Sequence, residues 1–361
     1  MTGRRALILG GGVAGLTCAR LLSARGWSVD CVGGAKKPGP IVIVNDLSAS
    51  LLVELWDADE TLFAGAHCLE GRLTRWESSA ALAYLTAPAF VIPIDVLVSR
   101  LADRVLAAGL RFVEQDDVQS ENYDWIIHAG GRDTAFGKHI AFGHRKGIAL
   151  SVMLTTSAPS DSAVVESVPG GWVIVIPQGK RRGTLQAVFS EHIIDPLEQL
   201  HSRLANSRFA STLVEEIADG PTSFVAMPGL SLTPCVPHSI AVGDAAIALD
   251  PMSGNGIGSG LRTAILASAV LDAAQRSKKP QVYFDHYTWR LHTAMRNHVN
   301  NCINFYGRAA YASSWCSEIH AMRTALPQII SPGLDGPAFK LNRDRLECVS
   351  GPIAAGFTRV S

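Results

Sequence analysis

The sequence RALILGGGVAGLTCARLLSARGWSVDCVGG, residues 5–34, is the stretch on which the fold prediction depends most. Its residues 6–9 form a short apolar run that is typical of a buried parallel strand. Glycines follow at once, residues 17–24 favour a helix with small residues on one side, and residues 27–32 favour a second strand. This order of strand, glycine-rich turn, helix and strand predicts a parallel βαβ unit.

The glycines of this stretch have the spacing of a dinucleotide-binding turn. Gly10 would allow the tight turn, Gly12 would let the backbone approach a pyrophosphate, and Gly15 would let helix and strand pack closely. The phosphate would lie at the helix N-terminus, where free N–H groups point outward. The acid that binds the adenosine ribose in such sites is missing, because its place falls on Gly33 and Asp30 stands three residues earlier. We therefore expect weakened nucleotide binding; the alternative is a glycine-rich turn in an unrelated α/β unit.

The composition argues against several kinds of partner. The chain has 361 residues, enough for one large or two modest domains. Lys+Arg and Asp+Glu number 32 each, so we expect neither nucleic acid nor a membrane surface as a partner. The seven cysteines are dispersed without a CxxC pair, and no run of eighteen apolar residues occurs, so we expect a cytoplasmic protein without a transmembrane helix.

A second glycine cluster lies far along the chain, in DPMSGNGIGSGL, residues 250–261. It follows GDAA, residues 243–246, which ends a run typical of a buried parallel strand. Glycine loses the most conformational freedom on folding, so four glycines at every second position indicate backbone that approaches another group closely. Between the clusters, residues 147–191 alternate apolar and polar positions with turn signals, which predicts antiparallel strands, and residues 193–218 favour helix.

Three motifs resemble those of the FAD-dependent monooxygenase superfamily, which also contains flavin-dependent halogenases and geranylgeranyl reductases. The first is the turn at residues 10–15. The second is DWIIHAGGRDT, in which Ala129, Gly131 and Thr134 match the pattern A-x-G-x-x-S/T. The third is GDAA followed by DPMSGNGIGSGL, which resembles the family's GD motif followed by P-x-x-G-x-G.

The resemblance implies an α/β fold: a Rossmann-like FAD-binding domain of the GR2 type, an inserted antiparallel β-sheet substrate domain and a helical C-terminal region. The FAD-binding domain would be discontinuous and would comprise residues 1–75, 97–150 and 235–280. The substrate domain would comprise residues 76–96 and 151–234, and the C-terminal region residues 281–361.

The resemblance also implies roles within the FAD site. Asp244 would bind a ribityl hydroxyl, and Pro251 would lie beside the isoalloxazine ring. Residues 254–257 would bring backbone N–H groups and a helix N-terminus to the flavin N1/O2 edge, where a positive helix end stabilises negative charge. The implied cofactor-binding residues are Gly10, Gly12, Gly15, Gly131, Asp244, Gly254, Asn255, Gly256 and Ile257. The implied catalytic residues are Pro251 and Trp172, and no metal site is expected.

The stretch GGWVIVIPQG, residues 170–179, resembles the halogenase-type strand W-x-W-x-I-P, with Ile174 in place of the second tryptophan. Trp172, Ile174 and Ile176 alternate, so they would line one sheet face as an apolar wall. The halogenase lysine would be expected before the strand that contains FVIP, but residues 68–92 contain no lysine. Halogenation is therefore disfavoured.

The C-terminal run, residues 283–323, resembles the helical tail of small flavoproteins that mature quinone-cofactor amine and amino-acid oxidases by acting on a tryptophan in a partner protein. RWESSAA, residues 75–81, is similar to that group too. Two positions depart from the family: Asn45 and Asp46 replace its Gly-Glu, and Pro93 opens the segment where its arginine would stand.

These likenesses imply an FAD-dependent monooxygenase or oxidase that acts on an aromatic group, either of a small molecule or of a tryptophan in a peptide or protein. Reducing power would come from a separate flavin reductase or from transiently docking NAD(P)H. The second hypothesis is a flavin-fold maturation or binding partner with weak or absent catalysis, which the altered positions favour. A plain NAD dehydrogenase is disfavoured by the GD motif.

Two further groups favour ordinary structural roles. His286, His292 and His298 are spaced by six, which places successive side chains about 120° apart round a helix and makes a poor metal-binding face. The basic residues 180–182 follow Gly179 and are expected at the tip of a hairpin.

Overall fold

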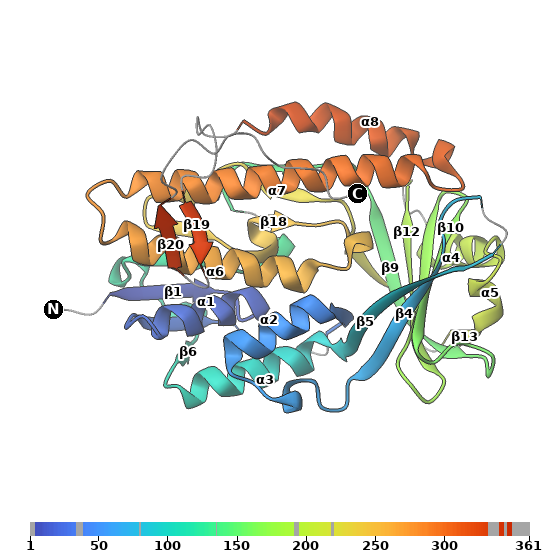
Figure 1. The fold of residues 1–361 in the computed structure, drawn as a ribbon, viewed down its shortest axis with the longest axis horizontal. Coiled ribbons are helices and arrows are strands. Elements are labelled where there is room, and N and C mark those ends of the chain that lie inside the picture. The colour runs from blue at the N-terminus through green and yellow to red at the C-terminus, as the bar shows by residue number, and fades with distance from the viewer. Residues whose placement is uncertain are drawn as a thin grey trace.

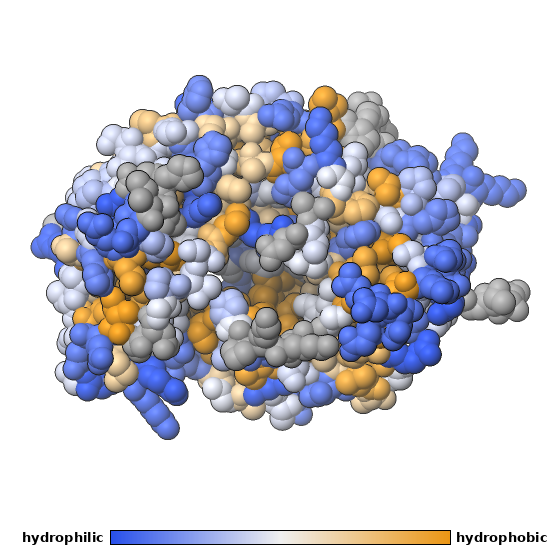
Figure 2. Space-filling view, turned by 180° about the vertical axis from the view of Figure 1, so that it is seen from behind, coloured by the Kyte–Doolittle hydropathy of each residue, from blue (hydrophilic) through white to orange (hydrophobic). Residues whose placement is uncertain are grey.

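The computed structural model describes residues 4–33, 39–78, 81–134, 136–190, 195–217, 220–330, 339–342 and 345–348. A parallel sheet and a larger, mostly antiparallel sheet form its two halves, and helix α7 (Gln281–Gly307) extends from the first towards the second (Figure 1). On the opposite face, apolar residues reach the surface in separate patches among polar ones, and the surface is hollowed near its centre (Figure 2).

The first sheet contains the N-terminal unit predicted from the sequence. Its order is β16-β17-β7-β1-β2-β6, and all neighbours are parallel except β16 and β17. In chain order, the five parallel strands run 3-2-1-4-5, the order of a doubly wound nucleotide-binding sheet. The strands are β1 (Arg5–Leu9), β2 (Ser28–Val32), β6 (Arg111–Val113), β7 (Trp125–His128), β16 (Cys235–Val236) and β17 (Ser239–Ala241).

The second sheet has nine strands in the order β13-β9-β12-β11-β10-β4-β5-β3, with β14 also paired to β9. Its pairs are antiparallel, as expected, except that β10 and β4 are parallel. The strands are β3 (Ile41–Asn45), β4 (His67–Arg75), β5 (Ala83–Pro93), β9 (Lys146–Leu154), β10 (Ser162–Val168), β11 (Gly171–Pro177), β12 (Arg182–Phe189), β13 (Val214–Ile217) and β14 (Thr222–Val225). Strands β3, β4 and part of β9 therefore lie in this sheet, although the expected boundaries put them in the FAD-binding domain.

The two faces of the large sheet pack against different cores. Trp172, Ile174 and Ile176 face the main core, which confirms their predicted alternation, while Val173 and Val175 face a second core. Helices α4 (Pro196–Ala205) and α5 (Ala210–Leu213) cover that second face. The expectation of helix throughout residues 193–218 was wrong at its end, because the chain there joins the sheet edge as β13.

Helices α1 (Val13–Ser23), α2 (Asp46–Trp56), α3 (Ile94–Ala107), α6 (Gly256–Ala274) and α8 (Cys316–Ala325) complete the main body. By length and composition α6 could cross a membrane, but 83% of its most apolar window is buried inside the protein, where α6 packs between α1 and α7. A small sheet joins β8 (His139–Ala141), β15 (Gly229–Ser231) and β18 (Ile247–Ala248).

The C-terminal region is only partly the helical one that was expected. It is helical through α8, but β19 (Phe339–Asn342) and β20 (Arg345–Cys348) then form a hairpin. Residues 331–338, 343–344 and 349–361 of that expected region lie outside the described residues. The basic residues 180–182 lie at the β11–β12 hairpin as predicted, with Lys180 and Arg181 at positive φ.

Candidate functional site

The three glycine motifs meet because each follows one of three neighbouring parallel strands. The turn at residues 10–15 follows β1, the second motif follows β7, and the GD motif follows β17. The carboxyl ends of parallel strands lie at one edge of a sheet, which is where ligands bind in such folds. Direct contacts join the motifs: a Cβ on Gly10 would overlap the Ala129 carbonyl oxygen, and one on Gly243 would lie 2.9 Å from the Ala14 Cβ.

The three fingerprint glycines have different surroundings. Gly10 has φ +124°, a conformation that favours glycine, and Gly15 packs so closely on Gly10 that a Cβ would overlap its carbonyl oxygen. By contrast, apart from Gly12 itself and the residues adjoining it, no heavy atom of the described residues lies within 4 Å of the place where a Cβ on Gly12 would be. The turn is thus closed on its packing side and open at Gly12, which leaves room for a bound group.

Two helix N-termini open at this edge. Helix α1 begins after Gly12 and helix α6 after Asn255, and neither N-cap residue makes a side-chain capping hydrogen bond. Cβ positions on Gly131 and Gly256 likewise meet no described heavy atom within 4 Å. Uncapped N–H groups with the positive end of the helix dipole bind anions, so this edge suits a phosphate and a negatively charged ring edge.

Asp244, the expected ribityl-binding residue, is paired with a residue that sequence reasoning missed. Arg132 Nε donates to the Asp244 carboxylate at 3.2 Å, and its Nη atoms donate to the carbonyl oxygens of Met227 and Leu249, each at 2.6 Å. Burial raises the pKa of Asp244, and Arg132 opposes that shift. Arg132 lies within the second motif and Asp244 within the GD motif. Their opposite charges were the sequence signal that could have indicated this pair.

The loop that begins with Asp250 meets the large sheet at a small cavity of about 130 Å³. Ser253 and Gly254 line it from the loop, Asn45 and Arg72 line it from β3 and β4, and the other lining residues are small or apolar. Asn45 Nδ2 donates to the Gly254 carbonyl oxygen at 3.1 Å, and its Oδ1 caps α2 by accepting from Ser48 N at 2.9 Å. The replacement of the family's glycine by Asn45 therefore ties the loop to α2.

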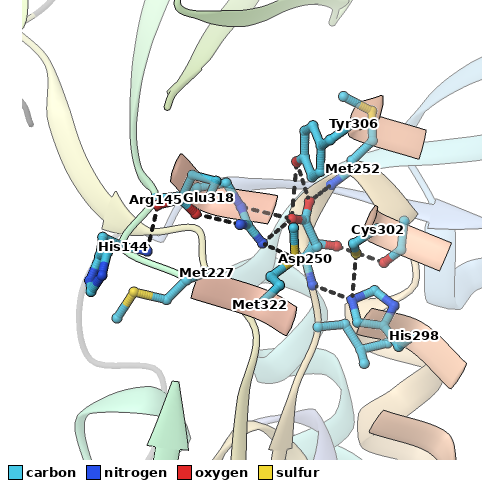
Figure 3. A network of polar contacts seen from close by, with 12 residues as sticks. His144, Arg145, Met227, Asp250, Met252, His298, Cys302, Tyr306, Glu318 and Met322 are labelled. Atoms are coloured by element: carbon cyan, nitrogen blue, oxygen red, sulfur yellow. Dashed lines mark hydrogen bonds and ion pairs between the residues drawn. The ribbon is translucent and has the colours of Figure 1, made fainter. Parts of the chain in front are cut away.

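A buried ionic network holds the same loop from its other side (Figure 3). Arg145, immediately before β9, pairs with Asp250 at 2.9 Å and with Glu318 of α8 at 2.5 Å. The three side chains are 0%, 1% and 2% exposed. Burial alone would lower the pKa of Arg145, but Asp250, Tyr306 and Glu318 raise it above its ordinary value. The guanidinium therefore stays charged and pairs with both carboxylates.

Helix α7 adds neutral hydrogen bonds to Asp250. The Tyr306 hydroxyl donates to the Asp250 carboxylate at 3.0 Å, and Asp250 N donates to His298 Nε2 at 2.9 Å. Burial and the Asp250 carboxylate raise the pKa of Tyr306, and burial lowers that of His298, so both groups stay neutral. Because Pro251 follows Asp250 directly, these contacts fix the start of the glycine-rich loop.

Trp172, the other expected catalytic residue, is buried and lies outside the lining of this cavity. Its indole N–H donates to the Tyr306 hydroxyl at 3.3 Å, so it contacts the network through Tyr306. Pro251 lies within the loop itself, and the roles given to both residues stay predictions. Sequence reasoning missed Arg145, Glu318 and the hydrogen bond of Tyr306 to Asp250; an aspartate directly before the loop proline was the available signal.

Glycine occupies the position at which a ribose-binding acid would be expected. Gly33 directly follows β2 and has φ +85°, a conformation that an acidic side chain would adopt only under strain. Asp30 is buried and bonded to Arg111, Arg5 and Tyr123, at 3.0, 3.3 and 2.9 Å. Its carboxylate is therefore already bonded to other side chains of the protein.

Comparison with known proteins relates the chain to solved structures alone. No protein-family model and no curated protein sequence matches it. It is similar to the peptidyl tryptophan dihydroxylase QhpG, which is essential for tryptophylquinone cofactor biogenesis. The identity is 19% and the TM-score 0.74, over 96% of this chain and 86% of that one.

Two further solved structures show the same likeness. The myxobacterial chondrochloren halogenase CndH, a variant of the FAD-dependent halogenases, is 17% identical with a TM-score of 0.73 over 92% of each chain. A 2-methyl-3-hydroxypyridine-5-carboxylic acid oxygenase is 17% identical with a TM-score of 0.63, over 91% of this chain and 99% of that one. These neighbours match the group that the three sequence motifs resemble. The chain has the mixed α/β fold of the FAD-dependent halogenases and of a peptidyl tryptophan dihydroxylase.

Proposed function

We propose that this protein is an FAD-dependent monooxygenase or oxidase that acts on an aromatic group. The observation that carries the proposal is the open backbone at Gly12, Gly131 and Gly256, where a Cβ would meet no described heavy atom within 4 Å. These positions follow neighbouring parallel strands or open a helix at one edge of the sheet. Bare backbone at that edge is where a dinucleotide binds.

The residues present fit FAD. The N–H groups that begin α1 would bind the pyrophosphate, with Gly12 as the point of closest approach. Asp244 would bind a ribityl hydroxyl through Oδ1, the carboxylate oxygen to which Arg132 does not donate. Residues 254–257 would present the N-terminus of α6 to the N1/O2 edge of the ring. When bound, FAD would supply the redox and oxygen chemistry of the reaction.

The chain's own contribution would be to hold the loop in place. Asn45 on one side and Arg145 with Asp250 on the other fix the loop, so the N-terminus of α6 is already in place before any ligand binds. Pro251 would lie beside the ring. Trp172 would act as a positioning residue, because its indole bonds Tyr306, which in turn bonds Asp250.

The aromatic group is proposed to belong to a tryptophan in a peptide or protein. The likeness to a peptidyl tryptophan dihydroxylase over 96% of this chain supports this choice, as do the helices α7 and α8 that follow the FAD motifs. A small aromatic molecule is the alternative substrate. Electrons would come from a separate flavin reductase or from NAD(P)H that docks transiently.

The test is direct. Purified protein is titrated with FAD and followed by its absorption spectrum. It is then supplied with reduced FAD, oxygen, chloride or bromide, and tryptophan-containing peptides or candidate partner proteins. Products are weighed by mass spectrometry. Gain of one or two oxygens, or loss of two hydrogens, supports the proposal. A halogen mass shift contradicts it, and FAD binding without any product favours a maturation or binding partner that is weakly catalytic or non-catalytic.

A further inference from the structure

Arg72 is a cation placed inside the cavity beside the glycine-rich loop. It lies in the middle of β4, paired with Leu85 on one side and Ala163 on the other. Its Nη2 atom lies 3.4 Å from the place where a Cβ on Gly254 would be. The guanidinium therefore faces the bend of the loop that is proposed to contact the flavin.

Arg72 also differs from the other partly or fully buried arginines around the site. Arg145 pairs with Asp250, Arg132 with Asp244, and Arg75, three residues further along β4, with Glu166 at 3.1 Å. Arg72 makes no hydrogen bond or ion pair to any other residue that the structure describes, and burial lowers its pKa. A half-buried charge without a counter-ion is costly, and a bound anion would supply the missing charge.

The other polar side chains of the cavity are already engaged. Asn45 bonds Gly254 and Ser48, and Ser253 Oγ donates to the Asp250 carbonyl oxygen at 2.7 Å. None of the residues lining the cavity carries a negative charge. A guanidinium offers five N–H donors in a planar fork that matches a carboxylate with two parallel bonds.

We propose that Arg72 binds a carboxylate of the substrate in this cavity, so that the substrate is a carboxylate-bearing aromatic compound. The aromatic part of this inference rests on the proposed function, which places an aromatic ring beside the loop. The anion site itself depends only on β4 and the cavity. The carboxylate can come from a small aromatic acid or from an acidic side chain next to a tryptophan in a peptide. Both sources present the same group to the guanidinium.

The experiment measures binding by calorimetry, with FAD present and again without it. The ligands are benzoate, its neutral analogue benzamide, and a tryptophan peptide with a neighbouring glutamate or glutamine. The variants are Arg72→Met, which removes the charge at similar length, and Arg72→Lys, which keeps it. Arg182→Met, at the exposed end of the β11–β12 hairpin, is the control. FAD affinity is measured for each variant.

We expect the wild type to bind benzoate or the glutamate peptide more tightly than its neutral counterpart. Arg72→Met should weaken that binding by about tenfold to a hundredfold, as for loss of a charge-assisted hydrogen bond, and Arg72→Lys should restore part of it. FAD affinity should be the same in all variants. The ligand that binds identifies the source of the carboxylate.

Two results would overturn the inference: equal affinity for acid and neutral ligands, or a tenfold loss of FAD affinity in Arg72→Met, which would assign the guanidinium to the cofactor. Failure of the wild type to bind FAD would instead reject the proposed function. Benzoate binding without FAD that Arg72→Met weakens would still support the anion site.

Discussion

Replacement of Arg145 by methionine should destabilise the protein strongly, because two buried carboxylates depend on one guanidinium. Asp250 and Glu318 are 1% and 2% exposed, and Arg145 bonds both. Methionine keeps much of the side-chain volume, so the change mainly removes the charge. The removal leaves Asp250 with the Tyr306 hydroxyl and Met252 N, and Glu318 with His144 N.

The expected magnitude follows from the burial of this network. Removing one member of a buried ion pair costs about 3–5 kcal/mol, because the remaining charge is left without compensation. Unfolding entropy is about 2.1 cal/mol/K per residue, so for 361 residues each kcal/mol corresponds to about 1.3 °C. The melting temperature of Arg145→Met should therefore fall by about 4–7 °C. Because Asp250 begins the glycine-rich loop, FAD affinity should fall as well.

Urea unfolding and differential scanning calorimetry would measure both quantities. The matched control is Arg276→Met, since Arg276 pairs with Asp272 but its side chain is 64% exposed, and loss of such a pair costs about 0–1 kcal/mol. If Arg145→Met proves too unstable to purify, Glu318→Gln provides a milder test that keeps the Asp250 pair intact. If the free energy of unfolding falls no more for Arg145→Met than for the Arg276→Met control, the buried pairs do not contribute the stability expected of them.

Three other outcomes are expected. Gly12→Val should abolish FAD binding with little change in the free energy of unfolding, since the Cβ position at Gly12 is open. Gly15→Ala should instead destabilise the fold by about 1–3 kcal/mol, because its Cβ would overlap the backbone of Gly10. Equal destabilisation by the two substitutions would contradict this expectation. Asp244→Ala and Gly256→Val should each lose FAD on gel filtration while keeping the circular dichroism of the wild type. Burial lowers the pKa of His286 to about 4, below its unfolded value of 6.5. The contribution of neutral His286 to the free energy of unfolding should therefore be fully present above pH 6.5 and decrease as the pH falls towards 4. The decrease should be less steep in His286→Phe.

The sequence predicted the parts of the site that local geometry determines. Gly10, Gly12 and Gly15 lie within a few residues of one another, and the strand, turn and helix around them form one local unit. The other motifs join that unit because β7 and β17 follow β1 across the sheet, an order that parallel connections favour. The alternation of Trp172, Ile174 and Ile176 was predictable for the same reason, since a strand repeats every two residues.

The parts that were not predicted depend on pairings between distant residues. Arg145 is 105 residues from Asp250 and 173 from Glu318, and a single ion pair produces no periodic pattern in a sequence. The partners of β3 and β4 were also not predictable, because a short apolar strand can join either sheet until its neighbours are known. Arg72 was also not predicted, because a lone arginine in a strand produces no pattern that shows what it faces.

Under the proposed function, the positions of these groups would separate cofactor binding from substrate selection. The loop at residues 250–257 is held by Asn45 on the side of the large sheet and by Arg145 and helices α7 and α8 on the other. A loop held on both sides has little freedom to adapt, so the N-terminus of α6 presents the same geometry to every substrate. The adaptable part of the cavity is then the surface of β4 and β5, where small residues surround a single charge, Arg72, that the described residues leave without a partner. Substitutions in the loop should therefore change flavin affinity, and substitutions in those strands should change which aromatic compound is accepted.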